Sequence, residues 1–294
     1  MDMSERKGLI LGLVGVVIFG LTLPATRASL TGLDPWFIAL GRGIVAGTAA
    51  AIVLVATGQP RPPRKDWRRL VLASAGVVLG FPLLATIAMQ YAPASHGGVV
   101  LALLPLATAL AGVALAGERP SAGFWACGIA GTVAVLAFAL IEGAANDGFH
   151  LADLLLGLAI AAAAIGYSEG GELARTMGGW QVICWALVIA APFLLLLLLL
   201  RGTPINWDAS ATAWGSFLYL ALFSQFIGFF AWYQGLALGG VAKVGQLQLL
   251  QTFVTLAAAA LLLGETVSGT EMAFAVLVVA IVALGRRMRV ERRS

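Results

Sequence analysis

The chain consists of long apolar runs joined by short polar connections. Ten runs are long enough to cross a bilayer, because a helical span needs ~20 residues. Apolar positions do not alternate with polar ones at every second residue, which argues against the strands of a membrane barrel. The pattern therefore predicts an all-α integral membrane protein with ten transmembrane helices. These cover approximately residues 7–26, 36–57, 67–91, 95–116, 122–141, 151–171, 180–200, 212–236, 242–263 and 270–286.

The second half of the chain repeats the first. Gly117-Glu118 closes one apolar run and returns as Gly264-Glu265 at the end of another, 147 residues later. Each half holds five predicted helices, and because five is odd, the second copy enters the membrane in the opposite orientation. We expect residues 1–145 and 146–294 to form two inverted five-helix repeats, an organisation typical of secondary transporters. The same offset relates Trp67 to Trp214, Gly98 to Gly245, Thr108 to Thr255 and Ser121 to Ser268.

The positive charges lie mainly on one side of the predicted membrane. If the N-terminus is cytoplasmic, 15 of the 18 Lys and Arg residues fall on cytoplasmic segments, as the positive-inside rule requires. The two largest groups, within 61–69 and 286–293, flank apolar spans. That position favours contact with anionic lipid headgroups over binding of nucleic acid. We expect a multi-pass protein of the cell membrane with both termini in the cytoplasm.

Composition and motifs favour transport over catalysis. Hydrophobic residues make up 60% of the chain and charged residues 11%, whereas soluble domains carry about 25% charged residues. The sequence contains no P-loop, no His-Glu-x-x-His helix and no Gly-x-Ser-x-Gly motif. Cys127 and Cys184 lie inside apolar runs, and His96 and His150 lack ligand spacing. We expect a protein that is not an enzyme, with no catalytic residue, metal or cofactor.

Several short motifs stand out, namely Leu104-Pro105-x-x-Thr108, the two Gly-Glu pairs, Arg42 and Ala88-x-x-Tyr91-Ala92. Together they resemble the EamA-type branch of the drug/metabolite transporter superfamily. The resemblance spans essentially the whole chain and implies ten helices, a central cavity walled by helices 1–4 and 6–9, and helices 5 and 10 at the periphery. It also implies export of amino acids and related metabolites, with exporters of aromatic amino acids as the nearest comparison. One departure is Thr252, where the family often has proline.

Polar residues inside the spans are the main candidates for a substrate site, because burying them in lipid is costly unless they face a cavity or a partner. The ninth helix carries four of them at i, i+3, i+4 and i+7, which places them on one helical face. They either line a cavity or form a hydrogen-bonded seam between helices. These four are Gln248, Gln251, Thr252 and Thr255.

Other candidates for substrate binding lie on helices 2, 3 and 8. Helix 8 presents Gln225, Trp232 and Tyr233, whose rings could stack on an apolar solute or simply pack. Helix 3 offers Thr86 and Gln90, one turn apart. Arg42 could bind a substrate carboxylate as a bidentate fork, or form a structural ion pair or reach the interface.

Charged residues at helix ends are candidates for gating. His96 and Lys243 are repeat mates and are expected on opposite sides of the membrane, as gates or as ordinary interfacial charges. Glu118 and Glu265 are expected to be structural, bonding backbone groups at the start of the next helix. No buried acidic residue is expected to carry protons, and Glu169 is expected to reach water. The energetic coupling of transport is therefore left open, and the alternatives are facilitated diffusion, exchange and proton antiport.

Glycines four residues apart are expected to let helices approach closely in lipid, either for static packing or for sliding. Together the patterns predict a secondary carrier that exports small metabolites, most simply amino acids, by alternating access. Few acidic residues lie in the spans, so zwitterions fit better than cations. The alternatives are efflux of drugs or other metabolites, a membrane enzyme, a channel and a scaffold. The expected partners are a small-molecule substrate and lipids, with the oligomeric state open and a monomer included.

Overall fold

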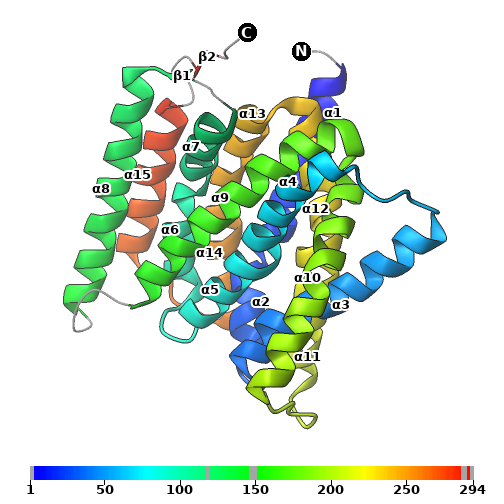
Figure 1. Cartoon of the computed structure of the whole chain (residues 1–294). Coiled ribbons are helices and arrows are strands. Elements are labelled where there is room, and N and C mark those ends of the chain that lie inside the picture. The colour runs from blue at the N-terminus through cyan, green and yellow to red at the C-terminus, as the bar shows by residue number, and fades with distance from the viewer. Residues whose placement is uncertain (1–2, 117–118, 146–150, 286–289, 292–294) are drawn as a thin grey trace.

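The computed structural model describes residues 3–116, 119–145, 151–285 and 290–291. Regular structure in these residues is helical, apart from the two-residue strands β1 (Arg119–Pro120) and β2 (Val290–Glu291), which pair antiparallel. The start of α1 and the short strand β2 lie at the same end of the helical bundle, which is its top in Figure 1. Glu118, His150, the second basic cluster and the expected repeat boundary lie outside the described residues.

The first half of the chain forms a series of helices that are interrupted inside several spans. The first span breaks between α1 and α2, the third contains a π-helical segment, η2, and the fourth a 3-10 turn, η3. The elements are α1 (Met3–Gly20), α2 (Thr22–Ser29), α3 (Pro35–Ala56), η1 (Arg64–Asp66), α4 (Trp67–Ala73), η2 (Ser74–Gly80), α5 (Phe81–Ala88), α6 (Ala94–Val100), η3 (Leu101–Leu103), α7 (Leu104–Ala116) and α8 (Ala122–Ala145).

The second half has the same kinds of interruption. A π-helical segment, η4, follows α11, and a 3-10 turn, η5, precedes α14. The elements are α9 (Leu151–Met177), α10 (Gly179–Arg201), α11 (Ala211–Leu218), η4 (Tyr219–Ile227), α12 (Gly228–Gly239), α13 (Val241–Gly245), η5 (Gln246–Gln248), α14 (Leu249–Leu263) and α15 (Gly269–Gly285).

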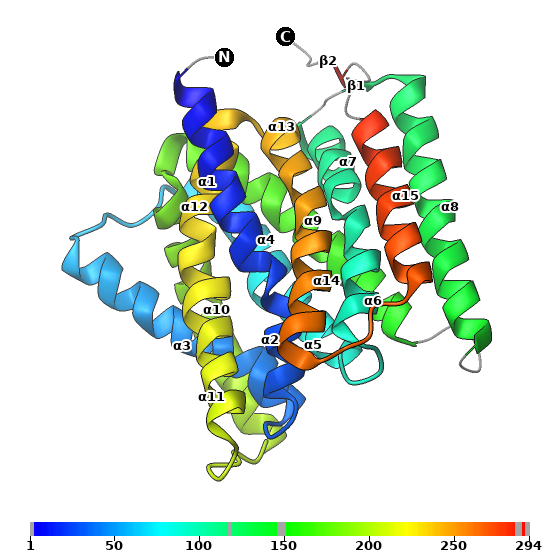
Figure 2. The ribbon, with the colours of Figure 1, turned by 180° about the vertical axis from the view of Figure 1, so that it is seen from behind.

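Eight helical segments of the described chain are long and apolar enough to cross a membrane. The prediction of an all-helical membrane protein is therefore confirmed, with eight of the ten expected spans meeting both criteria. The other two expected spans correspond to α8 and α15, which contain the shorter apolar helices 125–135 and 269–281. These two helices pack against each other at the edge of the bundle (Figures 1 and 2).

Helices from the two halves of the chain are interleaved. Helix α1 packs along α12, α3 along α10, and α9 against α5 and α7. Helix α14 contacts both α6 and α1. The view from behind shows α1 and α14 side by side in front of the helices that they cover (Figure 2). The interior of the bundle is thus formed jointly by both halves.

Glycine pairs make the closest of these contacts. A Cβ atom at Gly8 would stand 2.6 Å from the backbone N of Gly239, and one at Gly235 would stand 2.8 Å from the backbone N of Gly12. The glycines at four-residue spacing on α1 therefore meet those on α12 directly. This matches the expectation of close helix approach through small residues.

Polar caps fix several helix starts. Asp34 accepts hydrogen bonds from the backbone N of Trp36 and Phe37, at 2.8 and 3.1 Å. Ser268 and Glu271 form a reciprocal capping box at the start of α15, with distances of 2.7 and 3.0 Å. Such caps satisfy backbone donors that the first helical turn leaves without partners.

Glu265 corrects one prediction. Its carboxylate was expected to bond the start of the next helix, but Ser268 and Glu271 cap that helix themselves. Glu265 instead accepts hydrogen bonds from the backbone N of Ala94 at 3.0 Å and of Ser95 at 2.9 Å. These amides begin α6 in the first half of the chain. The carboxylate therefore joins two helices that are far apart in sequence, which a rule based on sequence neighbours could not detect.

Candidate functional site

A narrow cavity lies inside the bundle, where interrupted helices meet. It has about 20 Å³ of free volume, enough for one water molecule. Its walls come from the break between α1 and α2, from α3, η2, α5, α9, η4, α12 and α14. The lining residues are Phe19, Thr22, Arg42, Val77, Phe81, Ala163, Tyr167, Ser224, Gln225, Phe229 and Gln251.

Arg42 is the charged group of this cavity. Its side chain is 2% exposed, and its Nη2 donates a hydrogen bond of 2.9 Å to Ser224 Oγ. Ser224 Oγ is in turn 2.9 Å from Thr22 Oγ1. Arg42 Nε has no hydrogen-bond partner in the described structure, although its guanidinium could bind a carboxylate in a bidentate manner.

Gln225 joins the two π-helical segments at the cavity wall. Its Nε2 donates a 2.8 Å hydrogen bond to the carbonyl of Val77, so η4 is tied to η2. Gln225 was predicted to bind substrate, and it does line the cavity. Its amide nitrogen is nevertheless already engaged, which gives this residue a clear structural role in the closed cavity.

The polar face of the predicted ninth span, which is formed by η5 and α14, serves partly as a seam between helices and partly as a cavity wall. Thr255 belongs to a helix–helix seam, because its Oγ1 donates to the carbonyl of Gly20 at 2.8 Å. Gln251 lines the cavity, and its Oε1 has no partner in the described residues. The same is true of Thr252 Oγ1 and of both amide atoms of Gln248. All four residues are buried, so this face points into the protein.

Aromatic rings form one side of the cavity. The ring of Phe19 lies 5.0 Å from that of Phe229 and 6.4 Å from that of Tyr167. Trp232 packs behind them, 5.5 Å from Tyr167, and its Nε1 lacks a partner in the described structure. Tyr233 is hydrogen-bonded to the carbonyl of Gly166 at 3.0 Å. Trp232 and Tyr233 are thus buried next to the cavity without being among its lining residues.

The two candidates of the predicted third span, Thr86 in α5 and Gln90 after it, do not share a site. Thr86 is buried, and its Oγ1 has no hydrogen-bond partner among the described residues. Gln90 is exposed in the turn after α5, and its Nε2 makes only a long contact of 3.4 Å with the carbonyl of Ile87. Neither residue lines the central cavity.

His96 has a partner that the sequence did not reveal. Its Nε2 lies 2.7 Å from Asp153 Oδ1, and both side chains are buried. Its ring also packs against Phe138 of α8, with 4.9 Å between ring centroids. Lys243 lies in α13, and its side chain is not described. Asp153 lies at the start of an apolar run, directly after a polar stretch, and the sequence analysis did not single it out.

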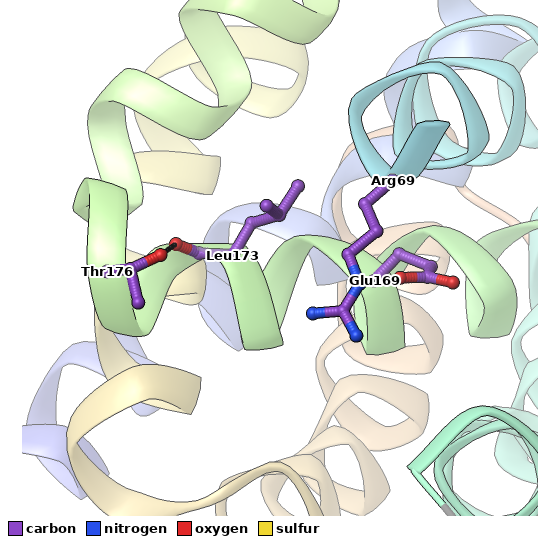
Figure 3. A network of polar contacts seen from close by, with 4 residues as sticks. All are labelled: Arg69, Glu169, Leu173 and Thr176. Carbon is purple, nitrogen blue, oxygen red and sulfur yellow. Dashed lines mark hydrogen bonds and ion pairs between the residues drawn. The ribbon is translucent and has the colours of Figure 1, made fainter. Parts of the chain in front are cut away.

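Glu169 also corrects a prediction. It was expected to reach water, but it is 7% exposed and lies 3.4 Å from Arg69 Nε. Figure 3 shows Arg69 reaching from α4 to this carboxylate on α9, with Thr176 bonded to the carbonyl of Leu173 further along the same helix. Glu169 is therefore a buried carboxylate with a basic partner.

A second hollow lies between α2, α11 and α14. It is larger, at about 350 Å³, and its described lining is uncharged and mainly apolar. A small polar solute needs placed polar groups to fix its orientation. The central cavity supplies them, so we take it as the candidate site. Ser224 accepts a hydrogen bond from Arg42, and Thr22 contacts Ser224. The sequence analysis missed both because single hydroxyls in apolar runs are common.

Comparison with known proteins identifies the family of this chain. A model described as the EamA-like transporter family matches residues 6–141 and again residues 150–285. A Bacillus subtilis (strain 168) protein named Uncharacterized transporter YdeK is 43% identical over 285 residues, covering 97% of this chain and 98% of the relative. A Probable amino-acid metabolite efflux pump of Salmonella typhimurium is 30% identical, covering 94% and 93%. A Probable terminal-alkyne amino-acid exporter of Streptantibioticus cattleyicolor is 28% identical, covering 95% and 93%.

The fold is shared with a solved structure. A chain described as "Crystal structure of protein" superposes with a TM-score of 0.65 at 22% identity, covering 95% of this chain and 98% of the other. The resemblance seen in the sequence motifs is confirmed by the family match, and the relatives named as transporters support transport over catalysis. The protein is a multi-pass membrane transporter, and the chain belongs to the EamA-like transporter family.

Proposed function

We propose that this transporter exports amino acids and related small metabolites by alternating access through the central cavity. The observation that carries the proposal is a cavity inside the bundle, lined by helices of both halves, that holds one buried arginine and several neutral polar side chains. Relatives named as an amino-acid metabolite efflux pump and an amino-acid exporter support the same substrate class.

We propose ten spans in two inverted repeats. The family model matches the chain twice, which supports two copies of one unit. The irregular segments recur as well: π-helices occupy Ser74–Gly80 and Tyr219–Ile227, and 3-10 turns occupy Leu101–Leu103 and Gln246–Gln248. The distribution of Lys and Arg supports cytoplasmic termini. Two inverted units allow the same site to open to either side.

The cavity volume supports a closed state in the transport cycle. A free volume of about 20 Å³ is far below the roughly 300 Å³ of a small ligand pocket. Substrate binding therefore requires the helices to separate. The break between α1 and α2 and the π-helical segments η2 and η4 are suitable hinges, because irregular turns mark the points where helices bend.

The lining residues have distinct proposed roles. Arg42 binds the substrate carboxylate, which would supply the partner that its Nε lacks among the described residues. Gln248, Gln251 and Thr252 offer polar atoms that have no partner in the described part of the chain, and these bind the remaining polar groups of the substrate. The rings near Phe19 receive an apolar side chain, and Thr86, Trp232 and Tyr233 support the walls as the helices separate.

The proposed closure of one side depends on the start of α6. Asp153 holds His96, and Glu265 holds the backbone N of Ala94 and Ser95. Both carboxylates come from the second half, so separating the halves on this side breaks both contacts. His96 is thus proposed as part of one gate, and Lys243, its repeat mate, as part of the opposite gate.

Counterflow in proteoliposomes tests the proposal. Vesicles preloaded with unlabelled phenylalanine, threonine or methionine are offered the labelled amino acid outside. We expect saturable uptake that depends on the preload and falls at least several-fold in Gln251→Leu. Gln90→Leu is the matched control, because the same change there affects an exposed side chain. Absence of counterflow with every amino acid would direct the search to drugs or other metabolites.

A further inference from the structure

The positive charge of Arg42 is not neutralised within the described part of the protein. No carboxylate oxygen of that part lies within 4.0 Å of its nitrogens. The buried carboxylates have other partners: Asp153 is held by His96, Glu169 by Arg69, and Glu271 by the backbone of Ser268. A buried charge without a partner is costly.

The remaining cavity lining supplies no opposite charge. Among the described residues that line it, Arg42 carries a charge and the others are apolar, aromatic, hydroxyl or amide side chains. Water is scarce in so small a space, so it cannot screen the guanidinium as bulk solvent would. The closed cavity therefore has an excess of one positive charge, which a ligand with one net negative charge would balance.

A zwitterionic amino acid does not provide that balance. Its carboxylate would pair with Arg42, but its ammonium group would bring a second positive charge into the same closed space. Within the described lining, the acceptors for an ammonium are neutral, such as Gln251 Oε1, which has no partner. A neutral amide N–H suits that oxygen without adding charge.

We propose that the central site selects monoanions: amphipathic carboxylates whose nitrogen is acylated or absent bind in preference to free amino acids. The carboxylate pairs with Arg42, an amide N–H donates to Gln251 Oε1, and an apolar group lies against the rings of Phe19, Tyr167 and Phe229. This inference rests on the proposed function for the site, and it narrows the substrate class from amino acids to their acidic derivatives.

Binding to the purified protein in detergent tests this inference without depending on transport. Three probes share one aromatic group: N-acetyl-L-phenylalanine, L-phenylalanine and 2-phenylethylamine. Isothermal titration calorimetry measures the affinity of each probe. We expect N-acetyl-L-phenylalanine to bind at least about tenfold more tightly than L-phenylalanine, and 2-phenylethylamine to bind most weakly. Equal or tighter binding of phenylalanine or the amine would overturn the inference. This comparison uses the unmodified chain, so it does not depend on a variant that folds.

Variants assign the preference to the guanidinium. Arg42→Gln should reduce the ratio between the first two probes to about one, whereas Arg42→Lys should keep most of it because the charge remains. An unchanged ratio in a folded Arg42→Gln protein would also overturn the inference. Counterflow separates the two proposals: uptake of free amino acids with no preference for the acetylated probe supports the carrier and refutes monoanion selection. Selective binding of N-acetyl-L-phenylalanine without counterflow of either probe supports the monoanion site and refutes the proposed carrier function.

Discussion

Asp153 lies against His96, with 2.7 Å between Oδ1 and Nε2, although 57 residues separate them in the chain. The contact joins the first turn of α9 to the first turn of α6. One turn of α6 is therefore held by a side chain of the second half, next to the backbone amides that Glu265 holds. This cluster is where the two halves are tied together by charged groups on one side of the cavity.

Removing the carboxylate should destabilise the closed protein. Asp153→Ala leaves the buried imidazole of His96 without its partner, and hydrogen bonds to charged groups contribute about 2 kcal/mol. We expect the free energy of unfolding in detergent to fall by roughly that amount, measured by denaturant titration. Asp208→Ala removes an exposed carboxylate and should change little. Equal effects of the two substitutions would contradict a structural contribution of the pair.

Glu265 is expected to control opening on the same side. Glu265→Ala removes a cap of the α6 amides, which is worth about 1 kcal/mol and corresponds to roughly a fivefold change in a two-state equilibrium. The reporter is a cysteine at position 251 in a chain whose Cys127 and Cys184 are replaced by alanine. We expect this cysteine to react with an external thiol reagent about fivefold faster when Glu265→Ala is present than when Glu265 is intact. The control is Glu271→Ala, whose carboxylate caps α15 instead. If both substitutions raise the rate equally, Glu265 has no special role in closure.

Close packing of α1 on α12 should not tolerate a side chain at the contact. In Gly235→Ala, the new Cβ would stand 2.8 Å from the backbone N of Gly12 and 2.9 Å from the carbonyl of Gly8. Such overpacking costs about 1–3 kcal/mol, so we expect a lower melting temperature. Gly157→Ala is a helical control with open space around the added methyl, and it should be neutral or slightly stabilising. A Gly235→Ala protein as stable as the parent would show that the helices can move apart freely.

The contact between the π-helical segments should also contribute to stability. Gln225→Leu keeps a side chain of similar size at the cavity wall but removes the donor to the carbonyl of Val77. An acceptor left without its partner costs about 1–3 kcal/mol, which thermal unfolding of the purified protein would detect. Gln90→Leu makes the same replacement at an exposed position, where the effect should be small. Similar losses at both positions would mean that the Val77 contact is not what matters.

The polar face on η5 and α14 illustrates how far sequence reasoning reached. Spacing at i, i+3, i+4 and i+7 indicated that Gln248, Gln251, Thr252 and Thr255 share one inward face, and all four are buried. Periodicity cannot tell a cavity from a neighbouring helix. The structure separates Gln251, which lines the cavity, from Thr255, which bonds the carbonyl of Gly20.

The sequence by itself determined the helical, membrane-spanning character of the chain. Unpaired backbone groups are costly in lipid, and a long apolar run pairs its own backbone groups by forming a helix. It also singled out Arg42 as a charge inside a span. Only the tertiary structure decided which groups meet: that Arg42 bonds Ser224, that Asp153 holds His96, and that Glu265 caps α6. These pairs join residues far apart in the chain, and their geometry depends on how the helices pack, which local hydrophobicity does not encode.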